Sequence, residues 1–318
     1  MKKKKKKSFG KFIMAIMAAT FAVLIAIEIN SINNAKYKDI NLEQLNTKQY
    51  IQAADKVSSG KFQINWQYMA AIDGVRYEND FSKATDESIT ALANMFLEKN
   101  STSDKLKDNE YKLVDLESVI SNFNFDKEKR DRVYHYIDNL KYTGTQKNNL
   151  NNSSKQEFIK GLYSQATEIY NKYGVLPSIS ISQAILESGW GKSDLSIKAN
   201  NLFGIKADNS WKGNKIKMNT SEYYNKKITD YFRAYSSNEE SIKDYGEFLK
   251  NNKRYKDSGV FKATQYIEQA NALEKSGYST VQNDKGENIY AELLTEIIQE
   301  QNLQLLDFEC EMNFFTNK

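Results

Sequence analysis

The chain has 318 residues, of which 40% are hydrophobic and 27% charged, and this composition is typical of a globular protein with a packed core. The formal net charge is +4, but seven lysines precede Phe12 and the remainder of the chain carries −3. The body therefore has no basic excess for a phosphate backbone, and we expect no nucleic acid partner. One cysteine (Cys310) and one histidine (His135) are too few for an internal disulfide or a zinc site of the usual ligands. We expect neither a metal nor a cofactor.

The N-terminal pattern predicts a membrane segment. Residues 12–27 carry no charge and follow the lysine-rich residues 1–11. Because a basic flank stays on the cytoplasmic side, everything after this segment is expected to be exported. We predict a cytoplasmic tip over residues 1–11 and a transmembrane anchor over residues 12–29, which makes the protein a single-pass protein of the cell membrane with an extracytoplasmic catalytic domain. The alternative is a signal segment that is cleaved on secretion.

A polar stalk is expected over residues 30–47, and helical patterns follow over residues 48–142. Apolar side chains recur at helical spacing in residues 64–72 and 88–97, and residues 132–140 form a third candidate helix. No long polar–apolar alternation is present. These patterns predict a small all-α accessory domain, whose protein partners and role the sequence leaves open.

A second domain is expected over residues 155–307, after a linker over residues 143–154 and before a tail over residues 308–318. The linker is rich in asparagine and serine and has little to bury. Within the second domain, residues 215–235 differ from the helical remainder because β-branched and aromatic residues flank Asn225 and two lysines. We therefore predict an α+β fold, in which a mainly helical domain carries a small β-hairpin lobe.

The segment 183–193 has the strongest chemical signal in the chain. It places Glu187 at the end of an apolar helix, followed at once by Gly189 and Trp190. The negative end of the helix dipole and burial beside an aromatic ring both disfavour ionisation, so we expect the pKa of Glu187 to be raised. A carboxylic acid that keeps its proton can protonate the leaving oxygen of a glycosidic bond. Spacing alone leaves open a solvated glutamate at a helix end.

Residues 184–193 and 199–206 together resemble the signature of the family 73 glycoside hydrolases. These are bacterial endo-β-N-acetylglucosaminidases with a lysozyme-like fold. Further short motifs continue the resemblance in the family's order, and they are Thr220-Ser-Glu-Tyr-Tyr224, Phe232-Arg-Ala-Tyr235, Arg254-Tyr255 and Gly277-Tyr-Ser-Thr280. The resemblance covers about residues 155–303. It implies a lysozyme-like catalytic domain that acts on the glycan strands of peptidoglycan.

Residue roles follow from the matching positions. The resemblance implies that Glu187 is the general acid, that Glu222 is a second carboxylate in the hairpin, and that Tyr278 is an active-site tyrosine beside the acetamido group. Four further residues are implied to bind substrate or support the cleft: Trp190, Asn201, Phe203 and Tyr255. One departure is visible, because a longer stretch separates Tyr278 from Tyr290 here than in the family.

The expected activity is hydrolysis of β-1,4 bonds after N-acetylglucosamine, as in a cell-wall autolysin. A muramidase or a lytic transglycosylase on the same fold is an alternative, and so is a non-catalytic wall-binding protein. Attack by water with help from Glu222, or by the substrate's own N-acetyl oxygen, is expected ahead of direct covalent attack by a carboxylate.

Overall fold

The computed structural model describes residues 37–101, 106, 109–143, 150–222 and 226–316. Among these residues, no helix is both long enough and apolar enough to cross a membrane. The expected anchor at residues 12–29 lies outside the described residues, together with the basic tip.

The first domain is built from five α-helices and a 3-10 turn around one core. The helices are α2 (Thr47–Ser58), α3 (Trp66–Arg76), α4 (Asp86–Asn94), α5 (Leu116–Ile120) and α6 (Lys127–Thr143), with the 3-10 turn η1 at Phe81–Lys83. Polar side chains start several of them. Asn65 accepts hydrogen bonds from the first amides of α3, and Thr85 forms a reciprocal capping box with Ser88 at the start of α4.

Two expectations for this region are wrong. The domain is not all-helical, because β1 (Leu97–Lys99) pairs antiparallel with β2 (Tyr111–Leu113). Each strand has three residues, which is too short for an alternating pattern to be visible in the sequence. The described end of the expected stalk is also part of the domain, because Ile40 and Leu45 are buried in its core.

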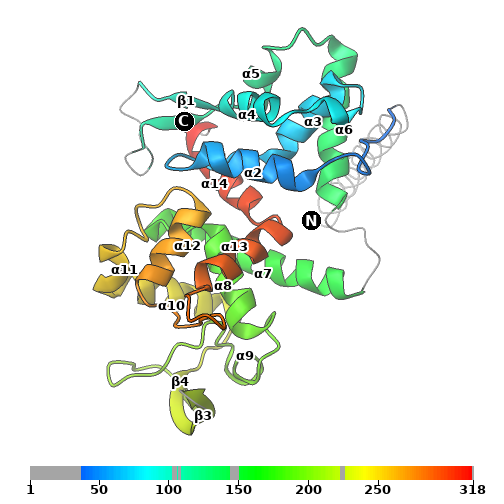
Figure 1. Ribbon diagram of the computed structural model, residues 1–318. Helices are drawn as coiled ribbons and strands as arrows, with labels where there is room; N and C mark the ends of the chain where they lie inside the picture. The colour runs from blue at the N-terminus through cyan, green and yellow to red at the C-terminus, as the bar shows by residue number, and fades with distance from the viewer. Residues whose placement is uncertain (1–36, 102–105, 107–108, 144–149, 223–225, 317–318) are drawn as a thin grey trace, which may run out of the picture.

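The second domain confirms the predicted α+β class. Its helices are α7 (Leu150–Tyr173), α8 (Pro177–Ser188), α9 (Asp194–Ala199), α10 (Asn238–Asn251), α11 (Lys253–Asp257), α12 (Tyr266–Lys275), α13 (Tyr290–Glu300) and α14 (Gln304–Thr316). Its hairpin consists of β3 (Lys215–Glu222) and β4 (Lys226–Arg233), paired antiparallel from Lys215 opposite Arg233 to Glu222 opposite Lys226. Figure 1 shows the hairpin at the end of this domain that lies away from the first domain. The last residues of the expected linker are helical, because α7 begins at Leu150.

Helix α8 lies at the centre of the second domain. Every residue from Pro177 to Ile185 is buried, and the helix packs against α7, α12, α13 and α14. Pro177 suits the first helical position because the amide hydrogen that it lacks would have no partner within the helix. The helix is therefore held on all sides along most of its length, and only its C-terminal end approaches the surface.

The expected tail at residues 308–318 is instead helix α14 as far as Thr316. It lies between the two domains (Figure 1). Phe308 packs in a small cluster with Phe62 and Leu113 of the first domain, while the Asp307 carboxylate accepts hydrogen bonds from the backbone and side chain of Ser178 at the start of α8. Burial of Phe308, Cys310 and Glu311 overturns the prediction of a tail.

Candidate active site

A tight turn ends α8 directly after Glu187. Gly189, Trp190 and Gly191 have φ angles of 57°, 63° and 71°, so three consecutive residues adopt the left-handed region. A tryptophan rarely adopts this conformation, and the Ser188 side chain helps to hold the turn by accepting a hydrogen bond of 2.7 Å from the Gly191 amide. A Cβ atom at Gly191 would lie 2.9 Å from the Phe158 ring. The turn thus fixes where α8 stops.

A cavity of about 460 Å³ opens at this end of α8. Its lining comes from segments that are distant in the sequence and meet around the helix end. The lining residues are Glu187, Phe203, Gly204, Ile205, Lys206, Asp208, Arg233, Phe248, Arg254, Tyr255, Tyr278 and Ser279. The size and the mixed polar and aromatic lining are those of a site for a sugar-sized ligand.

Glu187 enters this cavity with a raised pKa. Protein surrounds the carboxyl on most sides although the residue keeps an open face toward the solvent of the cavity, and this desolvation raises its pKa above the ordinary glutamate value. The Tyr290 hydroxyl donates a hydrogen bond of 2.7 Å to Glu187 Oε1, which partly offsets that effect. The direction predicted from the sequence is confirmed, and burial is its first cause.

Aromatic rings form the walls beside Glu187. The Tyr278 ring stacks on Tyr290 with the ring centres 5.5 Å apart, and it also contacts Tyr255 at 6.1 Å. Phe203 stacks on Tyr245 with the ring centres 4.0 Å apart and an angle of 11° between the planes. Flat aromatic surfaces of this kind suit contact with the apolar faces of sugar rings.

Four of the residues expected to form the site line the cavity together, and they are Glu187, Phe203, Tyr255 and Tyr278. Asn201 and Trp190 do not appear in its lining. Asn201 is buried and bonds the backbone of Ile205 and of Arg233, so it joins the loop after α9 to the base of the hairpin.

Trp190 packs beside the turn instead. Its ring meets Phe158 edge-on at 6.1 Å, and the Lys155 ammonium lies 4.7 Å above it. Its described ring contacts are therefore with helix α7, and neither partner lines the cavity. A direct contact between Trp190 and a sugar stays a prediction.

Glu222 lies at the far end of strand β3. Its backbone pairs with Lys226 beside the hairpin tip, whereas the cavity is lined by Arg233, which pairs with Lys215 at the base. Glu222 is seven steps along the strand from Lys215 at the base, a backbone distance of roughly 23 Å. The acidic residue that does line the cavity with Glu187 is Asp208. No sequence pattern marked Asp208, because it lies in an irregular loop.

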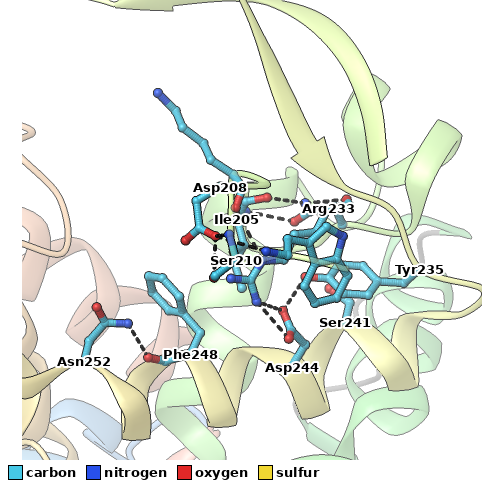
Figure 2. Close-up of polar contacts among 12 residues, drawn as sticks. Ile205, Asp208, Ser210, Arg233, Tyr235, Ser241, Asp244, Phe248 and Asn252 are labelled. Carbon is cyan, nitrogen blue, oxygen red and sulfur yellow. Dashed lines mark hydrogen bonds and ion pairs between the residues drawn. The ribbon is translucent and has the colours of Figure 1, made fainter. Parts of the chain in front are cut away.

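A polar network holds the base of the hairpin against α10 (Figure 2). The Arg233 guanidinium donates to both oxygens of Asp244 at 2.9 and 2.8 Å, and the Tyr235 hydroxyl donates to the same carboxylate at 2.6 Å. Nearby, Asp208 accepts hydrogen bonds from the Ser210 hydroxyl and amide, and these bonds hold its pKa below the ordinary value. The cavity thus combines one carboxyl whose pKa is raised with another whose pKa is lowered.

Comparison with known proteins identifies the relatives of this domain. Residues 163–303 match the family model Glucosaminidase, described as mannosyl-glycoprotein endo-beta-N-acetylglucosaminidase. The exo-glucosaminidase LytG of Bacillus subtilis is 42% identical over 161 residues, which are 48% of this chain and 54% of that protein. The peptidoglycan hydrolase FlgJ of Salmonella typhimurium is 37% identical over 153 residues, 46% of each chain. The chain therefore spans about half the length of these curated relatives.

Solved structures give similar matches over the same region. The catalytic domain of the autolysin Auto from Listeria monocytogenes is 29% identical, with 57% of this chain and 98% of that chain covered and a TM-score of 0.43. The glycoside hydrolase domain of Salmonella typhimurium FlgJ is 31% identical, with coverage of 51% and 96% and a TM-score of 0.39. The resemblance visible in the sequence motifs is confirmed by the match of residues 163–303 and by the identities to LytG and FlgJ. Through this second domain the chain belongs to the glucosaminidase family.

Proposed function

We propose that this protein is a peptidoglycan hydrolase that cleaves β-1,4 glycosidic bonds of the glycan strands after N-acetylglucosamine. One observation carries the proposal: Glu187, with a raised pKa, projects into a sugar-sized cavity of a glucosaminidase-family domain. Its relatives are named as an exo-glucosaminidase and as peptidoglycan hydrolases, which supports the substrate class. Cleavage within strands, rather than from their ends, is part of the proposal.

In this mechanism Glu187 gives its proton to the bridging oxygen as the bond from that oxygen to the anomeric carbon breaks. A water molecule supplies the hydroxyl group that the anomeric carbon gains, and its remaining proton restores the acid form of Glu187. The ring of Tyr278 contacts a sugar face, and the buried rings of Phe203 and Tyr255 support the cavity wall. Together they exclude bulk water, which strengthens the electrostatic interactions in the cavity.

The replacement Glu187→Gln tests the general acid. The variant keeps the shape of the side chain but has no acidic proton, so we expect the rate of strand cleavage to fall by about 10²- to 10⁴-fold. Digestion of purified peptidoglycan, followed by mass spectrometry of the released ends, measures both the rate and the bond that is cut. Full activity in a folded variant would contradict the assignment. Release of large fragments supports cleavage within strands, and release of single terminal units contradicts it.

The second carboxylate is best tested as a pair of variants. Glu222 matches the family motif, but its place on the hairpin requires the hairpin to bend toward the cavity around bound substrate. We propose that Glu222 assists the attacking group and that Asp208 binds a sugar hydroxyl. Glu222→Gln should then lower kcat, whereas Asp208→Asn should mainly raise KM. A fall of kcat in Asp208→Asn alone would transfer the role to Asp208.

The same variants separate a hydrolase from a lytic transglycosylase. A transglycosylase closes the cleaved sugar on its own hydroxyl and needs a single acid, so Glu222→Gln would remain active. Its products would also carry a cyclic anhydro end instead of a reducing end. We expect reducing ends, which reduction with borohydride and mass spectrometry can identify.

We also propose that the domain works outside the cytoplasmic membrane, held by residues 12–29. The uncharged segment after seven lysines supports this location. Protease added to intact cells should degrade the second domain, and the protein should remain in the membrane fraction. A soluble protein in the medium with a new N-terminus would instead indicate cleavage of a signal segment.

A further inference from the structure

A chain of buried side chains leads from the core of the second domain to the catalytic carboxyl. The Tyr245 hydroxyl donates to Gln183 Oε1, Gln183 Nε2 donates to the Tyr290 oxygen at 2.8 Å, and the Tyr290 hydroxyl donates to Glu187 Oε1 at 2.7 Å. Tyr245, Gln183 and Tyr290 are each at most 2% exposed. Three helices contribute, because Gln183 lies one turn before Glu187 on α8, Tyr245 lies on α10 and Tyr290 begins α13.

The Gln183 amide decides which group donates and which accepts in this series of hydrogen bonds. An amide has an acceptor on one side and donors on the other, so its orientation decides which tyrosine donates and which accepts. When Gln183 Oε1 faces Tyr245, the amide nitrogen donates to the Tyr290 oxygen. The Tyr290 hydroxyl has one proton, and it can then donate that proton only to Glu187.

The reverse orientation is disfavoured. It would make Tyr290 donate to the amide oxygen and make the Tyr245 oxygen an acceptor from the amide nitrogen. Among the described residues, the Tyr245 hydroxyl donates its one hydrogen bond to Gln183, and a reversed amide would leave that proton without this acceptor. A buried hydroxyl without an acceptor costs about 1–3 kcal/mol, so Tyr245 holds the amide in its observed orientation.

We propose that Gln183, held by Tyr245, is a positioning residue for the reaction: it directs the Tyr290 proton at Glu187 Oε1 and so leaves the catalytic proton on Oε2, the oxygen available to the substrate. The proposal rests on the proposed function of Glu187 as general acid. When Glu187 is protonated, the oxygen that accepts from Tyr290 is the carbonyl oxygen, and the acidic hydrogen lies on the other oxygen. Without this control the acidic hydrogen can turn inward and bond to Tyr290.

Two variants remove the control in different ways. Gln183→Met keeps the volume of the side chain but has no amide, and Tyr245→Phe frees the amide to turn over. In Tyr245→Phe, protonated Glu187 gains the option of donating to Tyr290, because the Tyr290 proton can then go to the amide oxygen of Gln183. In Gln183→Met, the Tyr290 hydroxyl loses the amide donor that strengthens its hydrogen bond to the ionised carboxylate. Both changes favour the acid form of Glu187. We expect the pKa of Glu187 to rise by about one pH unit in each variant. In Tyr245→Phe we also expect kcat on peptidoglycan to fall about tenfold with KM unchanged, since most of the acid then points away from the substrate.

The pKa is read without substrate, by a carbon-13 NMR titration of the full chain labelled at the glutamate carboxyls, with Glu187→Gln to identify the signal. Gln269→Met is a matched control. Gln269 is equally buried in the same domain, but it bonds the backbone of Leu176, Gly174 and Val260 rather than the chain to Glu187. This control should lose stability and leave the Glu187 titration unchanged.

Tyr290→Phe completes the test as a double-mutant cycle. If Gln183 acts through Tyr290, adding Gln183→Met to Tyr290→Phe should produce no further change in the Glu187 titration. An unchanged titration in folded Gln183→Met and Tyr245→Phe, or full additivity in the double variant, would overturn the proposal. Because the titration needs no activity, failure of the wild-type protein to cut peptidoglycan would count against the proposed function alone.

Discussion

The turn after Glu187 concentrates unusual backbone geometry in three residues. Gly191 is the most constrained of them, because its φ is +71° and a Cβ atom would lie 2.9 Å from the Phe158 ring. We expect Gly191→Ala to lower the free energy of unfolding by about 1–3 kcal/mol through backbone strain alone, and the shifted turn to lower activity as well. Urea unfolding and peptidoglycan digestion measure the two effects.

Gly161→Ala is the control for this prediction. Gly161 lies in α7 with open space around its Cα atom and an ordinary φ, so alanine should stabilise the protein by about 1 kcal/mol. Equal effects of the two replacements would show that the turn carries no special strain.

At the residue scale, the sequence predicted the acid but not its support. Glu187 was identifiable because a local pattern, an apolar helix that ends in Gly-Trp-Gly, contains the physical reason for its raised pKa. The contacts that orient it join positions far apart, since Tyr290 is 103 residues from Glu187 and 107 from Gln183. No local pattern records which buried tyrosine meets which amide, so Gln183, Tyr245 and Asp208 were found only in the structure.

At the scale of elements, α14 supports the start of α8, the helix that carries Glu187. Asp307 is fully buried and accepts from the Ser178 amide at 2.9 Å and from the Ser178 hydroxyl at 2.5 Å, so it acts as a cap supplied by another helix. Asp307→Ala leaves that amide without its acceptor, and we expect a loss of about 1–3 kcal/mol in the free energy of unfolding. Ser178→Ala keeps the backbone contact and should cost less. Chemical denaturation compares them, and a larger loss in Ser178→Ala would contradict the capping role.

The prediction of elements succeeded where the pattern was long. The hairpin β3–β4 was predicted because eight-residue strands show their β-branched and aromatic content clearly. Helix α14 was missed because Asp307 and Glu311 are buried acids, which hydrophobic periodicity treats as surface residues.

At the scale of the whole molecule, a buried carboxylate joins the two domains. Asp55 of α2 accepts hydrogen bonds from Tyr266 at 2.5 Å and Gln299 at 3.0 Å in the second domain, and from Gln63 at 3.0 Å in its own. The pKa of Asp55 is raised to about 6 because burial disfavours its charged form. The three hydrogen bonds offset part of this effect.

The sign of the resulting pH dependence follows from this raised value. The folded protein binds the Asp55 proton more tightly than the unfolded chain does, so this contribution to stability is complete below about pH 4 and is lost as the pH rises toward about 6. The loss is on the order of 3 kcal/mol. Asp55→Asn should remove it, so the difference in stability between wild type and variant should change across this window. Urea unfolding of both proteins at pH 4.5 and 7.5 measures this, and parallel stability curves would contradict it.

The first domain separates the start of the described chain from the cleft. The described chain starts at residue 37 within that domain, and the hairpin beside the cavity lies at the far end of the second domain (Figure 1). Because α14 and the Asp55 contacts join the domains directly, the separation between residue 37 and the cleft is set by packing between the domains. Under the proposed anchoring by residues 12–29, this packing would hold the cleft away from residue 37, and the enzyme would cut the layer of polymer that lies at that distance.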